Sequence, residues 1–241
     1  MAGTARRHSK RASGISSAGN KVHTEFDGAG KRADQSSTAG TAIDTTRPLD
    51  ATRELATAVG ALTYSEVAER IAVNIAHCLN ALLEKSPEDI RINPEWICDL
   101  HCSIAGELFP EWAGCFRVTD VQVGTHLPPP AHEVAVHVKN FCLDLEERLR
   151  HLHDAASISA LLAWVDWRFQ WIHPFKDFNG RTGRILLVAL SYKLDLPPVD
   201  PAADESGKTE YFNALRAADA GDIAPLTDLW LGRLMSGEAA L

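Results

Sequence analysis

The stretch His173-Pro174-Phe175-Lys176-Asp177-Phe178-Asn179-Gly180-Arg181-Thr182-Gly183-Arg184 decides how this 241-residue chain is organised. Upstream of it, apolar residues recur at helical spacing as far as Ile172. Pro174 then ends the helix, because proline has no backbone N–H and disfavours the helical conformation in the residue before it. Downstream, Asn179-Gly180 turns the chain into a second apolar helix from Ile185 to Leu194. The pattern predicts a helix-loop-helix with His173 at its mouth.

The same twelve residues bring together the groups that phosphate chemistry needs. The start of the second helix offers unpaired N–H groups and the positive end of the helix dipole, and both attract an anion. Histidine has the pKa range of a general base, aspartate is a hard oxygen ligand suited to Mg²⁺, and arginine is a forked donor for phosphate. We interpret the stretch as a phosphate site with a base beside it.

This stretch resembles the signature of the Fic-domain family, H-P-F-x-D/E-G/A-N-G/K-R-x-x-R, in every fixed position but one. The exception is Phe178, which stands where the family has Gly or Ala. The similarity extends from about Trp96 to Leu234 and includes the segment 113–117. The resemblance implies an all-α, Fic-like helical bundle with a short β-hairpin flap over the active site, in which residues 56–241 form the catalytic domain.

The family resemblance also implies an activity, that of a protein adenylyltransferase, which transfers AMP from ATP to a Ser, Thr or Tyr hydroxyl of a target protein. His173 takes the place of the general base, Asp177 that of the Mg²⁺ ligand, and Phe175 that of the buried anchor of the loop. The nucleotide-binding positions are Phe178, Asn179, Gly180, Arg181, Arg184, Tyr211 and Asn213. For Tyr211 and Asn213, a packing role is the alternative. Gly180 favours adenylyl transfer, since members with Lys there transfer only the terminal phosphoryl group.

Two further segments have counterparts in the family. The first segment comprises Val121, Gln122, Val123 and Gly124, at the start of a stretch rich in β-branched residues and proline. This composition favours a short β-hairpin, and the segment resembles the flap that positions the target in the family. A connecting loop is the alternative. The other is an inhibitory motif, S/T-x-x-x-E-G/N, which Ser65 and Glu69 match and Arg70 does not. Glu69 is either inhibitory or an exposed helix residue, and in the second case a separate antitoxin-like chain inhibits the enzyme or nothing does.

Phe178 leaves two other functions open. If this residue adopts the positive φ of a glycine, its side chain costs about 1 to 2 kcal/mol or shifts the loop. The domain is then an enzyme of the same family that uses another nucleotide donor, such as UTP, GTP or a CDP-linked compound, or a nucleotide-binding module without catalysis. Self-modification of the chain is an option for the active forms.

Composition limits the remaining classes. Residues 1–55 are rich in small, polar and basic side chains and hold hardly any large hydrophobic ones, so we expect a disordered polar tail. The formal net charge of -8 argues against a general nucleic-acid binder. No apolar run reaches the roughly eighteen residues that span a bilayer, so no membrane partner is expected. A cytoplasmic protein is the expectation, with an exported effector as the alternative.

Other local signals concern helix starts and histidines. Thr63 and Glu66 form a capping box, and Asn93 with Pro94 opens another helix. His101 lies between Cys98 and Cys102, but the second ligand pair of a zinc site is missing. Four further histidines lack the spacing of a ligand pair and are expected at the surface: His132, His137, His151 and His153.

Overall fold

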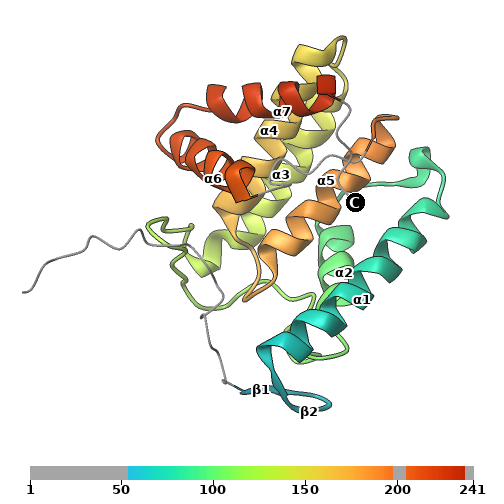
Figure 1. Ribbon diagram of the computed structural model, residues 1–241, viewed down its shortest axis with the longest axis vertical. Coiled ribbons are helices and arrows are strands. Elements are labelled where there is room, and N and C mark those ends of the chain that lie inside the picture. The colour runs from blue at the N-terminus through green and yellow to red at the C-terminus, as the bar shows by residue number, and fades with distance from the viewer. Residues whose placement is uncertain (1–53, 198–204, 237–241) are drawn as a thin grey trace, which may run out of the picture. The chain divides into compact units, whose positions relative to one another are not determined.

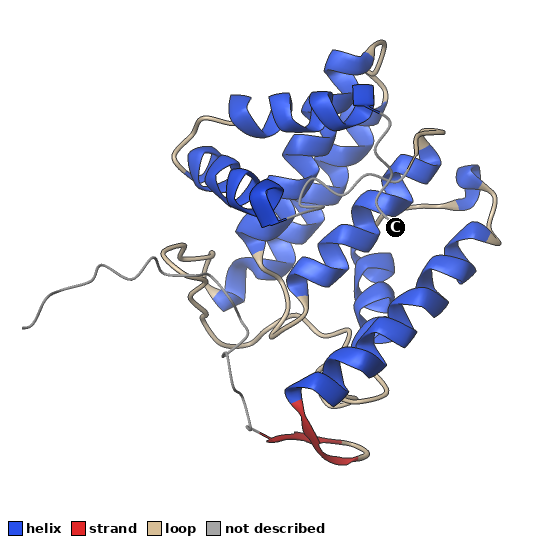
Figure 2. Ribbon diagram, viewed as in Figure 1, coloured by secondary structure: helices blue, strands red, loops and turns tan. Residues whose placement is uncertain are grey.

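The computed structural model describes residues 54–197 and 205–236 (Figure 1). Most of the predicted tail lies outside the described residues, and the chain enters them with two short strands, β1 (Glu54–Thr57) and β2 (Gly60–Thr63). The strands pair antiparallel, with Glu54 opposite Thr63 and Thr57 opposite Gly60 (Figure 2). The Ala58 N–H donates to the Leu108 carbonyl over 2.9 Å, which ties this hairpin to the segment after the second helix.

Helices make up most of the described residues, which confirms the predicted all-α bundle (Figure 2). The predicted helix-loop-helix is present as the fourth and fifth of them. Their bounds are α1 (Tyr64–Leu83), α2 (Pro94–Ala105), α3 (Val134–Leu149), α4 (Ala155–Ile172), α5 (Asn179–Lys193), α6 (Glu205–Asp219) and α7 (Ala224–Ser236), with two 3-10 turns, η1 (Pro87–Asp89) and η2 (Ala131–Glu133).

Two helix starts follow the side-chain caps that the sequence predicts. At α1, the Thr63 hydroxyl accepts from the Glu66 N–H, while the Glu66 carboxylate accepts from the Thr63 N–H over 2.7 Å. At α2, the Asn93 side chain accepts from the Trp96 N–H over 2.7 Å, and Pro94 occupies the first turn. These bonds satisfy donors that have no partner inside a helix.

Helix α4 is the centre of the bundle. Half of its eighteen residues are buried, on all sides of the helix, and α3, α5, α6 and α7 pack around it (Figure 1). Its Asp166 is only 2% exposed and accepts from the Tyr211 hydroxyl over 2.8 Å and from the Trp230 indole N–H over 3.3 Å. A buried carboxylate therefore fastens α6 and α7 to α4.

Helix α5 lies between α4 and the pair formed by α1 and α2 (Figure 1). Gly183 allows its close approach to α4, because a Cβ atom at this position would meet Gln170 Nε2 at 2.6 Å and Phe169 Cδ1 at 3.1 Å. The start of α5 is thus held next to the end of α4.

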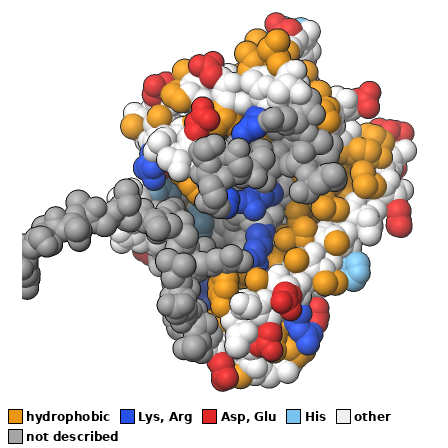
Figure 3. Space-filling model, in the orientation of Figure 1, with side chains coloured by type: hydrophobic (Ala, Val, Ile, Leu, Met, Phe, Trp, Pro, Cys, Tyr) orange, Lys and Arg blue, Asp and Glu red, His pale blue; other side chains and the backbone are white. Residues whose placement is uncertain are grey.

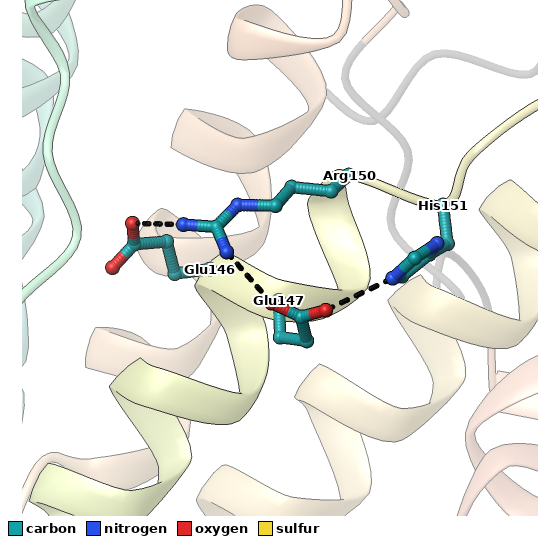
Figure 4. A network of polar contacts seen from close by, with 4 residues as sticks. All are labelled: Glu146, Glu147, Arg150 and His151. Atoms are coloured by element: carbon teal, nitrogen blue, oxygen red, sulfur yellow. Dashed lines mark hydrogen bonds and ion pairs between the residues drawn. The ribbon is translucent and has the colours of Figure 1, made fainter.

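The end of α3 carries an exposed charged network (Figure 4). Arg150 donates to Glu147 over 2.7 Å and to Glu146 over 2.8 Å, and His151 contacts Glu147 at 3.0 Å. His132, His151 and His153 are exposed, as predicted, whereas His137 is partly buried, with its ring edge against Trp171. Exposed ion pairs contribute about 0.2 to 1 kcal/mol each, so this network orders the surface more than it stabilises the fold.

Candidate active site

His173 ends α4 in the left-handed conformation, with φ 47° and its N–H bonded to the Phe169 carbonyl over 3.1 Å. Burial lowers the pKa of its imidazole to about 4, and the nearby charges of Arg117 and His126 act in the same direction. A hydrogen bond with the Gln170 backbone opposes this pKa shift in part. The imidazole is therefore neutral at pH 7 and able to accept a proton.

Arg117 fixes the loop around His173. Its side chain is only 4% exposed, and its Nε donates to the His173 carbonyl over 2.8 Å. The same guanidinium donates to the carbonyls of Thr119 and Pro129, one at each end of the flap segment. Sequence reasoning assigned no role to Arg117, although it closes the 113–117 segment of the family resemblance. The structure makes it the link between the flap and the loop of the candidate base.

Phe175 and Asn179 form the floor of the loop. Phe175 is fully buried, and its backbone N–H and carbonyl both bond to the Asn179 side chain over 2.9 Å. The Asn179 side chain is thus used inside the loop and is only 2% exposed. The Asn179 side chain maintains the shape of the loop. If Asn179 contacts a nucleotide, the backbone N–H is the group expected to do so.

His101 supports the same loop from α2. It is fully buried and stacks on Phe175, with ring centroids 3.8 Å apart and planes 9° from parallel. Its Nδ1 accepts from the Gly114 N–H over 2.8 Å, so Nε2 carries the hydrogen and donates to the Asp177 carbonyl over 3.1 Å. Burial lowers the pKa of His101 to about 4, in keeping with a neutral ring. Both ring nitrogens are bonded to backbone groups, a role that no sequence pattern around His101 indicates.

Phe178 has a positive φ of 57°, so the condition under which its side chain strains the loop is met. Its ring packs toward α2 and the segment after it, 5.7 Å from the Phe109 ring and 5.9 Å from the Trp112 ring. The Arg181 guanidinium lies over the same ring, 5.3 Å from its centroid. Phe178 is thus held by an aromatic wall formed by Phe109 and Trp112.

The start of α5 is open to an anion. No side chain caps it, so its first N–H groups have no partner within the helix. Gly180 is exposed, with no atom within 4 Å of a would-be Cβ. Arg181 has a buried Nη1 without a hydrogen-bond partner among the described residues. Arg184 is exposed and carries no ion pair in this part of the chain. Lys and Arg side chains gather near the middle of the face in Figure 3, in the region of α5.

Asp177 is the acidic residue of the site. Its side chain is exposed, and one carboxylate oxygen accepts from the Phe178 N–H over 2.6 Å, which leaves the other oxygen free to bind a cation. No group of three or more His, Cys, Asp or Glu in the described residues forms a preassembled metal site. A cation held by one carboxylate, phosphate oxygens and water is how proteins usually bind Mg²⁺, so the residues fit this ion.

The flap segment forms a turn closed by a single bridge between Val123 and His126, with hydrogen bonds of 3.0 and 2.9 Å. The predicted hairpin is reduced to this pair, and Gln122 adds a side-chain bond to the Gly124 carbonyl over 3.0 Å. Val121 is partly buried. Proline and glycine near the turn limit regular pairing on either side.

Three predicted residues stand apart from the signature. Tyr211 is buried and its hydroxyl donates to Asp166 over 2.8 Å, as its packing role requires, and its contact with a nucleotide stays a prediction. Asn213 is exposed on α6 and accepts from Arg216 over 2.6 Å, and within the described residues it makes no hydrogen bond to the signature. Glu69 is exposed on α1 and has no ion pair in the described residues, while Arg70 pairs with Glu107 at 2.9 Å.

The fold and the site together define a helical domain with an uncapped helix start and a neutral histidine before it. Residues 91–191 match the model of the Fic/DOC family. This segment of the chain is a Fic/DOC domain. Among the described residues, no helix has both the length and the apolar character needed to cross a membrane.

Curated relatives carry the name protein adenylyltransferase Fic. That of Drosophila persimilis is 31% identical over 140 residues, which are 57% of this chain and 26% of the relative. That of Drosophila erecta is 33% identical over 139 residues, which are 57% of this chain and 27% of the relative. The chain therefore spans about a quarter of the length of the curated relatives that it matches.

Solved structures support the same fold. Fic-1 from C. elegans superposes with a TM-score of 0.60 and 25% identity, over 70% of this chain and 49% of that chain. BepC, a VirB-translocated effector protein of Bartonella tribocorum solved with bound AMPPNP, superposes with a TM-score of 0.62 and 19% identity, over 76% of this chain and 93% of that chain. The second likeness shows the fold alone.

Proposed function

We propose that this chain is a Mg²⁺-dependent protein adenylyltransferase that transfers AMP from ATP to a Ser, Thr or Tyr hydroxyl of a target protein. One observation carries the proposal: a neutral His173 lies just before a helix start at which the buried Nη1 of Arg181 has no partner among the described residues. An unpaired buried guanidinium nitrogen is costly unless a ligand anion binds it. The name shared by the curated relatives supports the same reaction.

The chemistry follows from the groups at the site. His173 takes the proton from the target hydroxyl, and the hydroxyl oxygen then attacks the α-phosphorus of ATP. The bond from the α-phosphorus to the bridging oxygen breaks, and pyrophosphate leaves with the electron pair. Arg181, Arg184 and the first N–H groups of α5 stabilise the charge that gathers on the phosphates. A bound triphosphate also raises the pKa of His173, because a nearby negative charge favours the protonated imidazole.

Asp177 is the residue that holds Mg²⁺ in this proposal. Asp177 is exposed just before the helix start, and its second carboxylate oxygen, which accepts no hydrogen bond in the described residues, would bind the ion together with phosphate oxygens and water. The bound ion supplies charge neutralisation of the phosphates. His101 holds the carbonyl of the same residue, so the Asp177 backbone is fixed before the ion binds.

The target peptide is proposed to lie along the flap at Val121, Gln122, Val123 and Gly124, where an extended chain can be held by main-chain hydrogen bonds. Glu69 is exposed and pairs with no arginine of the signature in the described residues, which favours inhibition by a separate antitoxin-like chain or no inhibition at all. Self-modification is expected wherever a hydroxyl of the chain itself reaches the flap.

The test is incorporation of label from ATP labelled at the α-phosphate into proteins of a cell lysate. The wild-type chain is expected to label at least one protein, and His173→Ala is expected to abolish the label while ATP still raises the melting temperature. Labelling by both proteins, or by neither with any donor, contradicts the proposal. UTP, GTP and a CDP-linked donor, each labelled on the transferred phosphate, test the other donors that Phe178 leaves open. ATP-dependent stabilisation with no label from any donor identifies a binding module.

A further inference from the structure

The tip of the flap is attached to the rest of the domain through His126. Its Nε2 lies 3.0 Å from the Trp171 carbonyl oxygen, two residues before His173. Its Nδ1 lies 3.5 Å from a carboxylate oxygen of Asp219, at the end of α6. The side chains of His126 and Asp219 are 18% and 30% exposed. A single imidazole therefore bridges two helices from the flap.

Both atoms that face the imidazole are hydrogen-bond acceptors. The carbonyl can only accept, so Nε2 must carry a hydrogen. In the neutral ring, Nδ1 then turns a lone pair toward the Asp219 carboxylate, which is unfavourable. In the imidazolium, Nδ1 also carries a hydrogen and donates to this carboxylate. The contact geometry fits the charged form of His126.

We propose that His126 and Asp219 form a proton-dependent clasp that closes the flap over the site. The clasp is closed while His126 is protonated and opens when it loses its proton. This inference rests on the proposed function, since it assigns regulation to the flap that positions the target. His126 is a positioning residue, because it acts through the flap.

The surroundings of the clasp balance opposite charges. Asp219 is itself held by the Trp167 indole N–H, which donates to its other carboxylate oxygen over 3.0 Å. Among the described residues, Asp219 is the carboxylate that faces the ring of His126. The other titratable or charged groups near His126 are His173 and Arg117 in the loop, and Arg168 and His137 around Trp171. Replacing Asp219 leaves mainly positive or neutral groups, which favour the uncharged ring.

The ends and the tip of the flap segment are held by different side chains, the ends by Arg117 and the tip by His126. Arg117 binds the carbonyls of Thr119 and Pro129, which fixes both ends of the segment. Between these two ends, the described backbone is paired through the bridge from Val123 to His126. The clasp thus decides whether this tip lies against the end of α4, next to the candidate base.

Hydrogen exchange of the Val123 and His126 amides tests the clasp without any target protein. After correction for intrinsic exchange, the wild-type protection is expected to fall by about two- to fivefold between pH 5 and pH 8, the effect of a partly exposed ion pair. Asp219→Asn keeps an acceptor for Trp167 but removes the charge, and His126→Gln keeps a donor for Trp171 but cannot be protonated. Both variants are expected to lose the pH dependence. The control Asp228→Asn makes the same charge change on an exposed residue of α7 that has no ion pair among the described residues, and it should retain the pH dependence.

Each outcome decides the matter. Constant protection in the wild type, or the same pH dependence in Asp219→Asn, overturns the clasp. ATP-dependent thermal stabilisation checks that the variants fold, since a folded variant keeps the wild-type shift. If exchange behaves as expected while no labelled nucleotide is transferred at any pH, the clasp stands and the proposed transferase activity fails.

Discussion

Replacing Phe178 tests whether the loop of the site is strained and what offsets the strain. The residue has φ 57°, a conformation that costs a non-glycine residue about 1 to 2 kcal/mol. Its partly buried ring contacts the Phe109 and Trp112 rings at 5.7 and 5.9 Å. The contacts of Phe178 with the aromatic wall should therefore offset the free energy lost to the backbone strain.

The structure sets the size and the order of the effects. Half-burying a phenyl ring stabilises by roughly 1 kcal/mol, and each of the two ring contacts adds about 0.5 kcal/mol. Phe178→Ala loses these contributions and keeps most of the strain, so it should destabilise by about 2 kcal/mol. Phe178→Gly loses the same contacts but regains the free energy of the backbone strain. This gain is reduced by about 0.4 to 1 kcal/mol, because glycine makes the unfolded chain more flexible. The expected net cost for Phe178→Gly is about 1 kcal/mol.

Urea unfolding of the three proteins measures these differences, provided that the m-value is unchanged. Gly180→Ala is the matched control, because Gly180 is helical and open, and this change should stabilise by about 0.4 to 1 kcal/mol. The variant with alanine at position 178 is thus expected to be less stable than the variant with glycine there, whereas alanine at position 180 is expected to make the protein more stable than glycine does. An alanine variant at 178 that is more stable than the glycine variant would refute the strain argument.

Three further predictions concern single side chains. Arg181→Met removes a buried nitrogen without a partner among the described residues, so the ligand-free melting temperature should not fall while ATP-dependent stabilisation is lost; a retained ATP shift contradicts the phosphate role. The folded-state pKa of His101 is about 4, below the usual value, so the unfolded chain binds a proton that the folded chain refuses and stability falls as pH drops from about 6.5 to about 4. His101→Gln should reduce this slope by up to about 1.4 kcal/mol per pH unit, measured by urea unfolding across pH, whereas exposed His132→Gln should not; equal slopes sink the argument. Glu69→Gln should leave AMP labelling unchanged, since Glu69 is exposed without an ion pair in the described residues, and a several-fold rise would restore its inhibitory role.

The helices could be predicted because their signals are local. The caps at Thr63 and Asn93 and the proline at 174 lie within a few residues of the boundaries that they set. The β1–β2 hairpin has no such signal, because each strand has four residues and too little periodicity to recognise. Its attachment to the Leu108 carbonyl is a contact between distant parts of the chain, which sequence patterns do not record.

The parts of the candidate site that depend on neighbours in sequence could also be predicted, and those that depend on neighbours in space could not. The contiguous signature predicted that His173 would lie beside the start of α5, and the structure has this arrangement. It did not predict that the Asn179 side chain turns inward to Phe175, because the direction of a side chain depends on its neighbours in space. Arg117 and His101 reach the loop from segments more than fifty residues away, so only the fold could reveal their roles.

Mass spectrometry of the modified protein is the sharpest test of AMP transfer by His173. After incubation with ATP and Mg²⁺, an AMP adduct is expected on a Ser, Thr or Tyr side chain of a target or of the chain itself, present with the wild type and absent with His173→Ala. An adduct of phosphate alone, or an AMP adduct that persists in His173→Ala, would contradict it.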